Sequence, residues 1–309
     1  MERLFCLGEA LSYFPGRTFL HSPSETKIQA LLRLLSDPNE QVAKTIQHEF
    51  VRIGPSALPF LEKAGADDTA LESRVAFVRD EILFAQLKEE FSTFVTHCSR
   101  QMDWEEGAFL IAKLAYPDVD IPHYQQCLDQ LTEEFRKKWH AENSAPGKVA
   151  RLLSAFLFKD KGFSGNRIHY HDPDNSYLHR VIESRQGIPI SLSAIYVFVG
   201  NRLNLPLSGV GMPGHFLVKI EGEPIPQFVD CFNGGAFLRE QDCEQFITAS
   251  GLDYSPEFLE KSPTRLILAR MLRNLLSIYE REQQNPMTKR VETLLQILQE
   301  SSTDDDPSP

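Results

Sequence analysis

Residues 185–232 read RQGIPISLSAIYVFVGNRLNLPLSGVGMPGHFLVKIEGEPIPQFVDCF, and they determine the architecture of the chain. A Gly-Ile-Pro turn at 187–189 leads into an apolar segment of helical length, which ends at a Leu-Pro break. Two short strand-like runs follow, one around His215 and one around Asp230. A helix and two strands that bring a histidine and an aspartate together form the floor of a catalytic pocket if a nucleophile stands where the helix begins.

The composition of the 309 residues is that of an ordinary soluble globular protein. Hydrophobic residues make up 42% and charged residues 24%, and the length suffices for about one to three domains. The formal net charge is −11, whereas phosphate groups are bound by clustered lysines and arginines. We therefore expect neither nucleic acid nor an anionic membrane as the main partner.

The five cysteines are scattered, without a CxxC motif or the Cys/His spacing of a zinc site. This pattern predicts neither a disulfide framework nor a metal site, and we expect no cofactor. The first residues, MERLFCLGEALSYFPGR, lack the basic and continuous apolar regions of a signal peptide. No run of about 18 apolar residues occurs anywhere. We expect a cytoplasmic protein.

The first 92 residues are expected to form a helical segment. Apolar residues recur at helical spacing from Thr26, a second periodic stretch stops at Gly54-Pro55, and a shorter one follows. The sequence LLRLLSDPNEQVAKTIQHEFVRIGPSALPFLEKA resembles a HEAT repeat, in which antiparallel helices meet at an Asp-Pro turn. One unit is clear, and a second over 71–94 rests only on continued periodicity. A generic helical hairpin is the alternative interpretation.

Residues 86–162 have the periodicity of amphipathic helices and carry no recognisable chemistry. The following stretch, GFSGNRIHYHDPDNSYL, is rich in Gly, Asn, Asp and Ser, which predicts a loop with tight turns. His169, His171 and His179 lie close together here, but the acidic residues between them belong to a turn that contains proline. We interpret these histidines as solvated or hydrogen-bonded, and not as metal ligands.

Three blocks carry a resemblance to a known family: FSGNRIHYHDPDNSYLHRVIESRQGIPISLSAIY, GVGMPGHFLVK and VDCFNGG. In this order, over about residues 100–250, they resemble the SirB-type branch of the transglutaminase-like superfamily. Its bacterial members are often described as regulators of sirC (invasion-gene) expression. The resemblance implies an α+β fold, with a papain-like core and an antiparallel sheet, flanked by all-α segments. We expect this domain, with its N-terminal helices, over residues 93–256.

The resemblance implies thiol chemistry in active members. A cysteine at the N-terminus of the core helix is activated by the helix dipole and by a histidine on a following strand, which an aspartate on the next strand orients. The motifs place these last two roles on His215 and Asp230. In active members the nucleophile comes directly after an Arg/Lys-x-Gly-x pattern and about fifteen residues before the x-x-Pro break that ends the helix. In this chain the pattern is residues 185–188 and the break is residues 204–206, and both place Pro189 at the nucleophile position. Proline has no nucleophilic group, and its fixed φ suits the first turn of a helix.

Two other residues are candidate nucleophiles. Ser191 lies two positions after Pro189, about 200° round the helix, so we expect it to face away from His215. If the helix begins later, Ser191 becomes its N-cap and its oxygen binds backbone N–H groups. Cys231 follows Asp230, and adjacent residues on a strand point to opposite faces.

The polar residues expected at the start of the core helix define a candidate pocket. Besides His215 and Asp230, this pocket is predicted to contain Asn166, Tyr170, Asn175, Arg185, Pro189 and Asn233. Buried polar groups need partners, so a structural network in which His215 holds Asp230 explains part of this set. A pocket for a ligand or peptide, with an acyl or anionic group at the helix N-terminus, is the other interpretation.

Residues 257–300 are predicted to form two amphipathic helices around Asn285-Pro286, and they resemble one tetratricopeptide-like unit. The last residues, 301–309, are acidic and are expected to be disordered.

The sequence therefore favours a non-catalytic protein that binds an unidentified protein or peptide and acts as a regulatory scaffold. Pro189 and the helical segments at both ends support this hypothesis. The alternative is a hydrolase or acyl-transfer enzyme that uses His215 and Asp230 with Ser191 or Cys231 as a non-standard nucleophile. A regulator that acts on nucleic acid is disfavoured by the negative charge.

Overall fold

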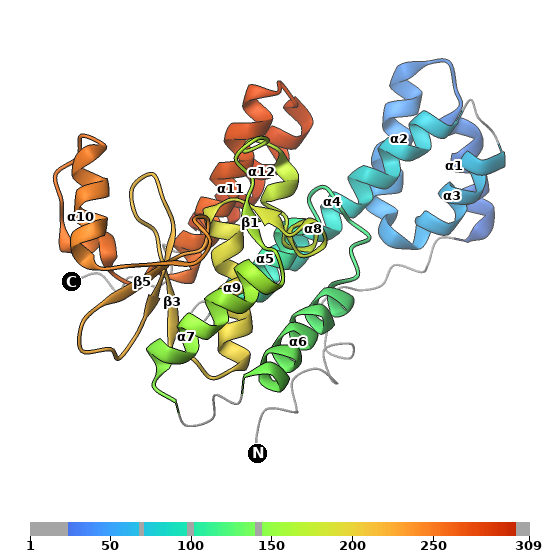
Figure 1. The fold of residues 1–309 in the computed structure, drawn as a ribbon. Coiled ribbons are helices and arrows are strands. Elements are labelled where there is room, and N and C mark those ends of the chain that lie inside the picture. The colour runs from blue at the N-terminus through green and yellow to red at the C-terminus, as the bar shows by residue number, and fades with distance from the viewer. Residues whose placement is uncertain (1–23, 68–70, 98–101, 140–143, 301–309) are drawn as a thin grey trace. The chain divides into compact units, whose positions relative to one another are not determined.

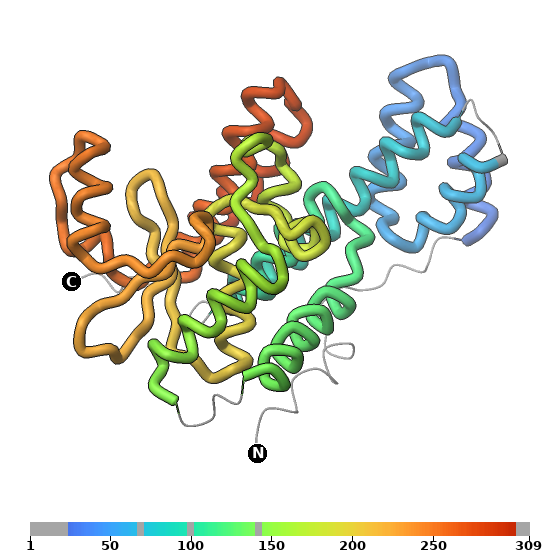
Figure 2. The backbone as a smooth tube through the Cα atoms, in the orientation of Figure 1, coloured from blue at the N-terminus to red at the C-terminus, as the bar shows by residue number. Residues whose placement is uncertain are grey.

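The computed structural model describes residues 24–67, 71–97, 102–139 and 144–300. The chain divides into two compact units, residues 1–86 and residues 87–309. Figure 1 labels their helices and strands, and Figure 2 traces the path of the backbone through them. The domain boundaries expected after residues 92 and 256 stay predictions.

The N-terminal unit is helical. Its segments are α1 (Glu25–Leu35), α2 (Glu40–Ile53), α3 (Leu58–Asp67) and the first part of α4 (Glu72–His97). Side-chain oxygens cap two of these helices, since Ser24 accepts from the Lys27 N–H and Asn39 accepts from the Gln41 N–H. Helix α2 ends at Gly54, whose φ of 77° is a conformation that favours glycine.

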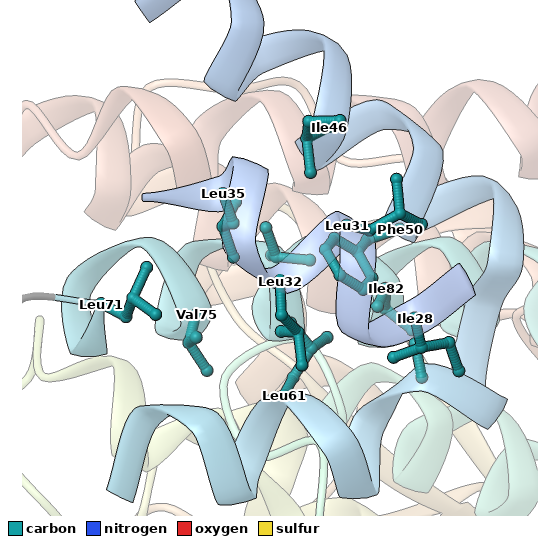
Figure 3. Packing of buried hydrophobic residues seen from close by; sticks show 12 residues of the cluster. Ile28, Leu31, Leu32, Leu35, Ile46, Phe50, Leu61, Leu71, Val75 and Ile82 are labelled. Atoms are coloured by element: carbon teal, nitrogen blue, oxygen red, sulfur yellow. The ribbon is translucent and has the colours of Figure 1, made fainter. Parts of the chain in front are cut away.

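Hydrophobic side chains from these helices form the core of the N-terminal unit (Figure 3). Leu35 of α1, Phe50 of α2 and Leu61 of α3 are completely buried in it. Arg74 of α4 donates through Nη1 to the carbonyl oxygens of Leu35 and Asp37, at 2.6 and 2.8 Å. These bonds satisfy carbonyl groups that the end of α1 would otherwise leave unpaired.

Residues 72–97 form one continuous helix of 26 residues. The second helical pair that the periodicity allowed over 71–94 is therefore not formed. The sequence of α4 contains neither glycine nor proline, so nothing in it breaks the helix. The resemblance of the preceding helices to a HEAT repeat stays a prediction.

The C-terminal unit combines helices with a small sheet. Its helices are α5 (Trp104–Ala112), α6 (Ile121–Lys138), α7 (Pro146–Ser154), α8 (Leu178–Ser184), α9 (Pro189–Arg202), α10 (Glu240–Ala249), α11 (Thr264–Arg281) and α12 (Asn285–Glu300). A π-helical turn, Ala155–Asp160, continues α7. None of the helices in the described ranges is long and apolar enough to span a membrane.

Four strands form an antiparallel sheet in the order β3-β4-β5-β6. They are β3 (Leu207–Val210), β4 (Leu217–Ile220), β5 (Gln227–Asp230) and β6 (Ala236–Leu238). The sequence predicted β4 and β5 and missed the flanking strands β3 and β6. A separate parallel pair, β1 (Ser164–Gly165) with β2 (Gln186–Gly187), lies just before the core helix.

Helix α9 is the centre of the C-terminal unit, and every residue from Pro189 to Gly200 is buried. It contacts α6, α7, β3 and β4, and in Figure 1 it lies between the sheet and α6. A helix that is apolar all round is typical of a protein core. Trp104 of α5 packs edge-on against Phe198 of α9, with ring centroids 5.3 Å apart. The predicted α+β fold is confirmed.

Helices α11 and α12 form a hairpin, and α11 packs on α5. Gly107 permits this contact, because a Cβ atom there would lie 2.6 Å from Cδ1 of Leu268. Before α8, the buried hydroxyl of Tyr177 is hydrogen-bonded to that of Tyr279 at 2.5 Å. Helix α11 is thus part of the core of this unit. Its resemblance to a tetratricopeptide-like unit stays a prediction.

Candidate functional site

The structure brings His215 and Asp230 together. Asp230 ends β5, and His215 lies in the turn two residues before β4, although we expected it on a strand. Nε2 of His215 is 3.0 Å from Oδ2 of Asp230, and the residues are 9% and 4% exposed. The two atoms are within ion-pair distance, but no hydrogen bond of good geometry joins them. With Nε2 directed at Asp230, Nδ1 is the ring nitrogen left for a further partner.

Asn233 completes the environment of the Asp230 carboxylate. Its backbone N–H donates to Oδ1 at 3.1 Å and its side-chain amide donates to Oδ2 at 2.6 Å. Burial acts to raise the pKa of Asp230, but the contacts with His215 and Asn233 outweigh it and hold the pKa below its ordinary value. Arg167 in turn donates to the Asn233 side-chain oxygen. Asp230 is therefore a carboxylate at neutral pH.

The turn that carries His215 is held from the C-terminal helices. Arg270 of α11 donates to the carbonyl oxygens of Met212 and His215, at 2.9 and 2.8 Å. The hydroxyl of Ser262 accepts from the Gly211 N–H at 2.8 Å. The backbone of the turn that carries His215 is thus held by residues about fifty positions further along the chain.

The helix that should present a nucleophile begins at Pro189. Ile188 is its extended N-cap residue, and Pro189 occupies the first helical position, as its fixed φ favours. Ser191 lies in the first turn, fully buried, and is not the N-cap. Its Oγ accepts from the Ile188 N–H at 3.1 Å and donates to the Asn175 carbonyl at 2.6 Å. The hydroxyl proton of Ser191 is therefore already engaged in the core.

Cys231 is also an unfavourable nucleophile. It follows Asp230 in the turn after β5 and is completely buried. Burial raises the pKa of its thiol far above the ordinary value, so the reactive thiolate is disfavoured at neutral pH.

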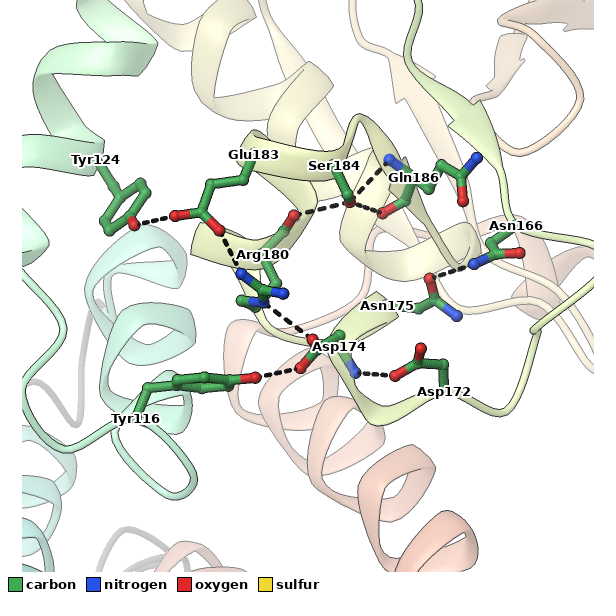
Figure 4. Close-up of polar contacts among 10 residues, drawn as sticks. All are labelled: Tyr116, Tyr124, Asn166, Asp172, Asp174, Asn175, Arg180, Glu183, Ser184 and Gln186. Carbon is green, nitrogen blue, oxygen red and sulfur yellow. Dashed lines mark hydrogen bonds and ion pairs between the residues drawn. The ribbon is translucent and has the colours of Figure 1, made fainter.

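Asn166, Tyr170 and Asn175 shape the loop before the core helix. The side-chain amide of Asn175 donates to the His169 carbonyl at 2.6 Å. Its side-chain oxygen accepts from the Asn166 amide at 3.0 Å, as Figure 4 shows. The Tyr170 ring lies 5.8 Å from that of Phe232, which is itself 6.5 Å from the His215 ring. Aromatic contacts thus connect this loop to the His215–Asp230 pair.

Contrary to expectation, Arg185 does not join these residues. It ends α8 in the left-handed conformation, with φ of 61°, and this turn directs its guanidinium over the ring of Phe163 at 4.7 Å. There it lines a separate pocket with residues of α6, including Tyr124 and Cys127. The motif located Arg185 correctly in the sequence but did not indicate its side-chain direction.

Apolar side chains border the His215 ring. The Phe246 ring of α10 lies 5.6 Å from it and is 44% exposed, and Tyr170 is 40% exposed. Exposed aromatic residues beside a polar site are typical of binding surfaces.

A second polar cluster around α8 was not foreseen (Figure 4). Tyr116 donates to Asp174 and Tyr124 donates to Glu183, each at 2.5 Å. Arg180 bridges the two carboxylates, at 2.9 and 2.6 Å. The paired residues are 58 and 59 positions apart in the sequence, so no local motif signals them.

His179 lies at this cluster and is only 3% exposed. We expect His179 to be solvated or hydrogen-bonded, and neither ring nitrogen has a protein hydrogen-bond partner among the described residues. No group of three or more metal-ligating side chains occurs in the described ranges either. Burial lowers the pKa of His179, which outweighs the attraction of nearby carboxylates. The imidazole is therefore neutral at neutral pH.

Comparison with known proteins identifies the class of this fold. A family profile described as the transglutaminase-like superfamily matches residues 122–273. The UPF0162 protein of Xylella fastidiosa (strain 9a5c) is 38% identical over 178 residues, which are 56% of this chain and 63% of that protein. Protein SirB1 of Salmonella typhimurium is 27% identical over 197 residues, 62% of this chain and 72% of that protein. Human F-box only protein 21 is 30% identical over 206 residues, 57% of this chain and 32% of that protein.

By this match, residues 122–273 are a transglutaminase-like domain. Its similarity to SirB1 and to UPF0162 proteins places it in the SirB-type branch, as the sequence predicted. The chain spans 63% of the length of the Xylella relative. No solved structure matches the chain significantly.

Replacing Arg270 with leucine should loosen the His215 turn, because two buried carbonyl oxygens lose their donor. We expect a loss of unfolding free energy of about 1–3 kcal/mol, measured by urea denaturation, and faster hydrogen exchange at the His215 amide. Arg273→Leu changes an exposed arginine of the same helix and is the matched control. Equal stability of the two variants would show that Arg270 does not hold the turn.

The lowered pKa of His179 predicts a specific acid sensitivity. Below the ordinary value of 6.5 the unfolded chain takes up a proton that the folded chain still excludes, so folding stability falls as the pH falls through this range. His179→Gln removes the imidazole and with it this pH-dependent contribution to folding stability. When the pH is lowered from about 7.5 to about 5.5, the urea midpoint of the variant should therefore fall less than that of the wild type. The exposed His171→Gln is the control. An identical pH profile for wild type and His179→Gln would exclude this effect.

Proposed function

We propose that this chain is a non-catalytic transglutaminase-like protein that binds a protein or peptide partner and acts as a regulatory scaffold. Pro189 is the observation that carries the proposal. It begins α9, at the position where the family motif calls for a nucleophilic cysteine. A site with a histidine and an aspartate but no attacking atom cannot form a covalent acyl intermediate.

The residues around Pro189 do not supply a substitute. The Ser191 hydroxyl is buried and donates to the Asn175 carbonyl. The Cys231 thiol is buried, and its raised pKa keeps it protonated. Each would require a rearrangement of the core before it could attack a substrate.

The remaining features of the site suit recognition. The His215 ring lies 3.0 Å from the Asp230 carboxylate, on a turn whose backbone Arg270 holds, and offers a polar group beside the exposed ring of Phe246. A peptide segment with an apolar side chain and a polar or acyl group next to it matches this combination. The net charge of −11 supports a protein partner over nucleic acid.

The second candidate is a hydrolase or acyl-transfer enzyme with a non-standard nucleophile. The observation in its favour is the buried His215–Asp230 contact, which Asn233 supports with two hydrogen bonds. Such an arrangement orients an imidazole for proton transfer. The two candidates differ in whether an attacking group can reach His215.

Intact-mass labelling with a fluorophosphonate and with iodoacetamide separates the candidates. We expect no fast adduct that depends on His215, because neither Ser191 nor Cys231 is activated. Ser191→Ala, Cys231→Ala and His215→Ala serve as the comparison, and adducts that persist in His215→Ala are background. A single fast adduct that is lost in His215→Ala and in one nucleophile variant would overturn the non-catalytic proposal.

The binding surface can be tested with two aspartate substitutions of exposed apolar residues. Phe246→Asp places a charge beside His215, whereas Leu266→Asp places one on α11. The partner is first captured with the wild-type chain, and its binding is then measured with purified proteins. Leu266→Asp should bind the partner as the wild type does, whereas the affinity of Phe246→Asp should be at least about tenfold lower than that of the wild type. Equal binding by both variants would remove the His215 surface from the proposal.

A further inference from the structure

A pocket that shares no residue with the His215 site lies where residues of α7, β5 and β6 come together. Its volume is about 300 Å³. The lining comes from these three elements, from the loop between β4 and β5, and from the residue before α10, and it consists of Arg151, Ile225, Gln227, Phe237, Leu238 and Arg239.

Arg151 of α7 is held in place at this pocket. Its guanidinium lies over the ring of Phe237, with Cζ 4.1 Å from the ring centroid, and Nη2 donates to Oε1 of Gln227 at 2.8 Å. Within the described ranges, the Arg151 side chain makes no other hydrogen bond and no ion pair. Most of its N–H groups are therefore available to a ligand. A guanidinium that is already oriented loses less conformational entropy when it binds.

The polar side-chain groups of the lining are hydrogen-bond donors. A guanidinium has no acceptor atom, which applies to Arg151 and to Arg239, the exposed N-cap residue of α10. Gln227 has one acceptor atom, Oε1, and that atom already accepts from Arg151. The part of the Gln227 amide that remains is the NH₂ group, which donates. These groups match a ligand whose polar atoms are acceptors.

The charge of the lining is positive. Arg151 and Arg239 line the pocket, and no carboxylate does. Like Arg151, the Arg239 side chain has no ion-pair partner among the residues that the structure describes. An anion would be attracted by both guanidinium groups, whereas a cation would be repelled. The net charge of −11 opposes the approach of anions, but charges farther away than about 8–10 Å are largely screened by salt.

The acidic residues beside these arginines have other partners. Glu240 accepts from the Tyr254 hydroxyl at 2.7 Å, and Asp242 accepts from the backbone N–H of Arg239 at 2.7 Å. Glu223, in the loop before β5, accepts from a backbone N–H at the start of α7 at 2.8 Å. These carboxylates weaken the positive potential near the pocket, but they do not occupy the guanidinium donors.

We propose that this pocket binds a phosphate monoester. Such a group carries a charge of about −1.5 to −2 at pH 7 and three acceptor oxygens, which match two guanidinium groups and an amide NH₂. Its organic part packs on the partly buried Phe237 and on Ile225, whose side chain is 67% exposed. A small phosphate ester and a phosphorylated side chain of another protein share this chemistry. The inference goes beyond the proposed scaffold function and does not depend on it.

Calorimetric titration of the full chain with phenyl phosphate at about pH 7.5, where the phosphate is mainly dianionic, tests the inference. Two ligand controls keep the aromatic ring and change the charged group. Benzoate carries one carboxylate, and phthalate carries two. Acetyl-phosphoserine methylamide distinguishes a phosphorylated side chain from a small ester, by which of the two phosphate probes binds more tightly.

Four variants test the contribution of the arginines. Arg151→Gln and Arg239→Gln each remove one guanidinium. Arg151→Lys keeps the positive charge and removes the planar fork of donors. Lys159→Gln removes an exposed cation that does not line the pocket, and it is the matched control.

We expect phenyl phosphate to bind with a Kd of about 1 mM or below, and benzoate at least about tenfold more weakly. Each glutamine variant should weaken phenyl phosphate binding at least about fivefold, because charge-assisted hydrogen bonds are lost. Arg151→Lys should recover part of the loss, and Lys159→Gln should have no effect. The backbone amide NMR signals of Phe237 and Arg239 in the wild-type chain should shift on addition of phenyl phosphate. This readout needs no variant, so it decides the matter even if an Arg151 variant does not fold.

Three results would overturn the inference. One is the absence of phenyl phosphate binding up to about 10 mM. Another is equal affinity for phthalate, which would show that the pocket recognises charge alone. The third is phenyl phosphate binding that leaves the Phe237 and Arg239 signals unchanged and is the same in Arg151→Gln and Arg239→Gln. In that case the ligand binds elsewhere on the protein.

Discussion

The burial of α9 from Pro189 to Gly200 is the constraint on which the rest of the C-terminal unit depends. Because this part of the helix has no solvent face, every polar group in its first turn needs an internal partner. Ser191 meets this need by bonding to Ile188 and Asn175. A side chain at Gly187 would collide with it, since a Cβ atom there would lie 2.7 Å from Ser191 Oγ. The start of the helix thus fixes the loop that contains Asn175, and that loop forms one side of the candidate site.

The His215–Asp230 pair is positioned by parts of the chain that are independent of any nucleophile. Asn233 holds the carboxylate, and Arg270 holds the backbone of the His215 turn. An imidazole fixed in this way keeps its orientation whether the first helical residue is a cysteine or a proline. This explains how such a site can retain its geometry when the residue at the start of the core helix changes, and why the geometry alone does not define an activity.

The sequence predicted what local pattern encodes. The apolar run of α9 and its proline start gave the core helix, and the motif order gave the pairing of His215 with Asp230. None of the four strands has more than four residues, too few for an alternating pattern. Strands β4 and β5 were predicted because they adjoin the motif residues His215 and Asp230, and β3 and β6 were missed because they carry no such motif. The direction of Arg185 depends on a left-handed residue, and the Tyr124–Glu183 contact joins residues 59 positions apart. Such features arise from tertiary packing, which a single sequence does not display.

The anchoring of the His215 turn by α11 also determines how the protein can be dissected. The superfamily profile ends at residue 273, in the middle of α11 (Thr264–Arg281). A fragment that stops before this helix would leave the carbonyl oxygens of Met212 and His215 without the donors of Arg270. It would also leave the Tyr177 hydroxyl without Tyr279 and expose the apolar face that α11 covers. The smallest piece of the chain that keeps an intact site therefore extends through α11, beyond the boundary that the sequence blocks of the family suggest.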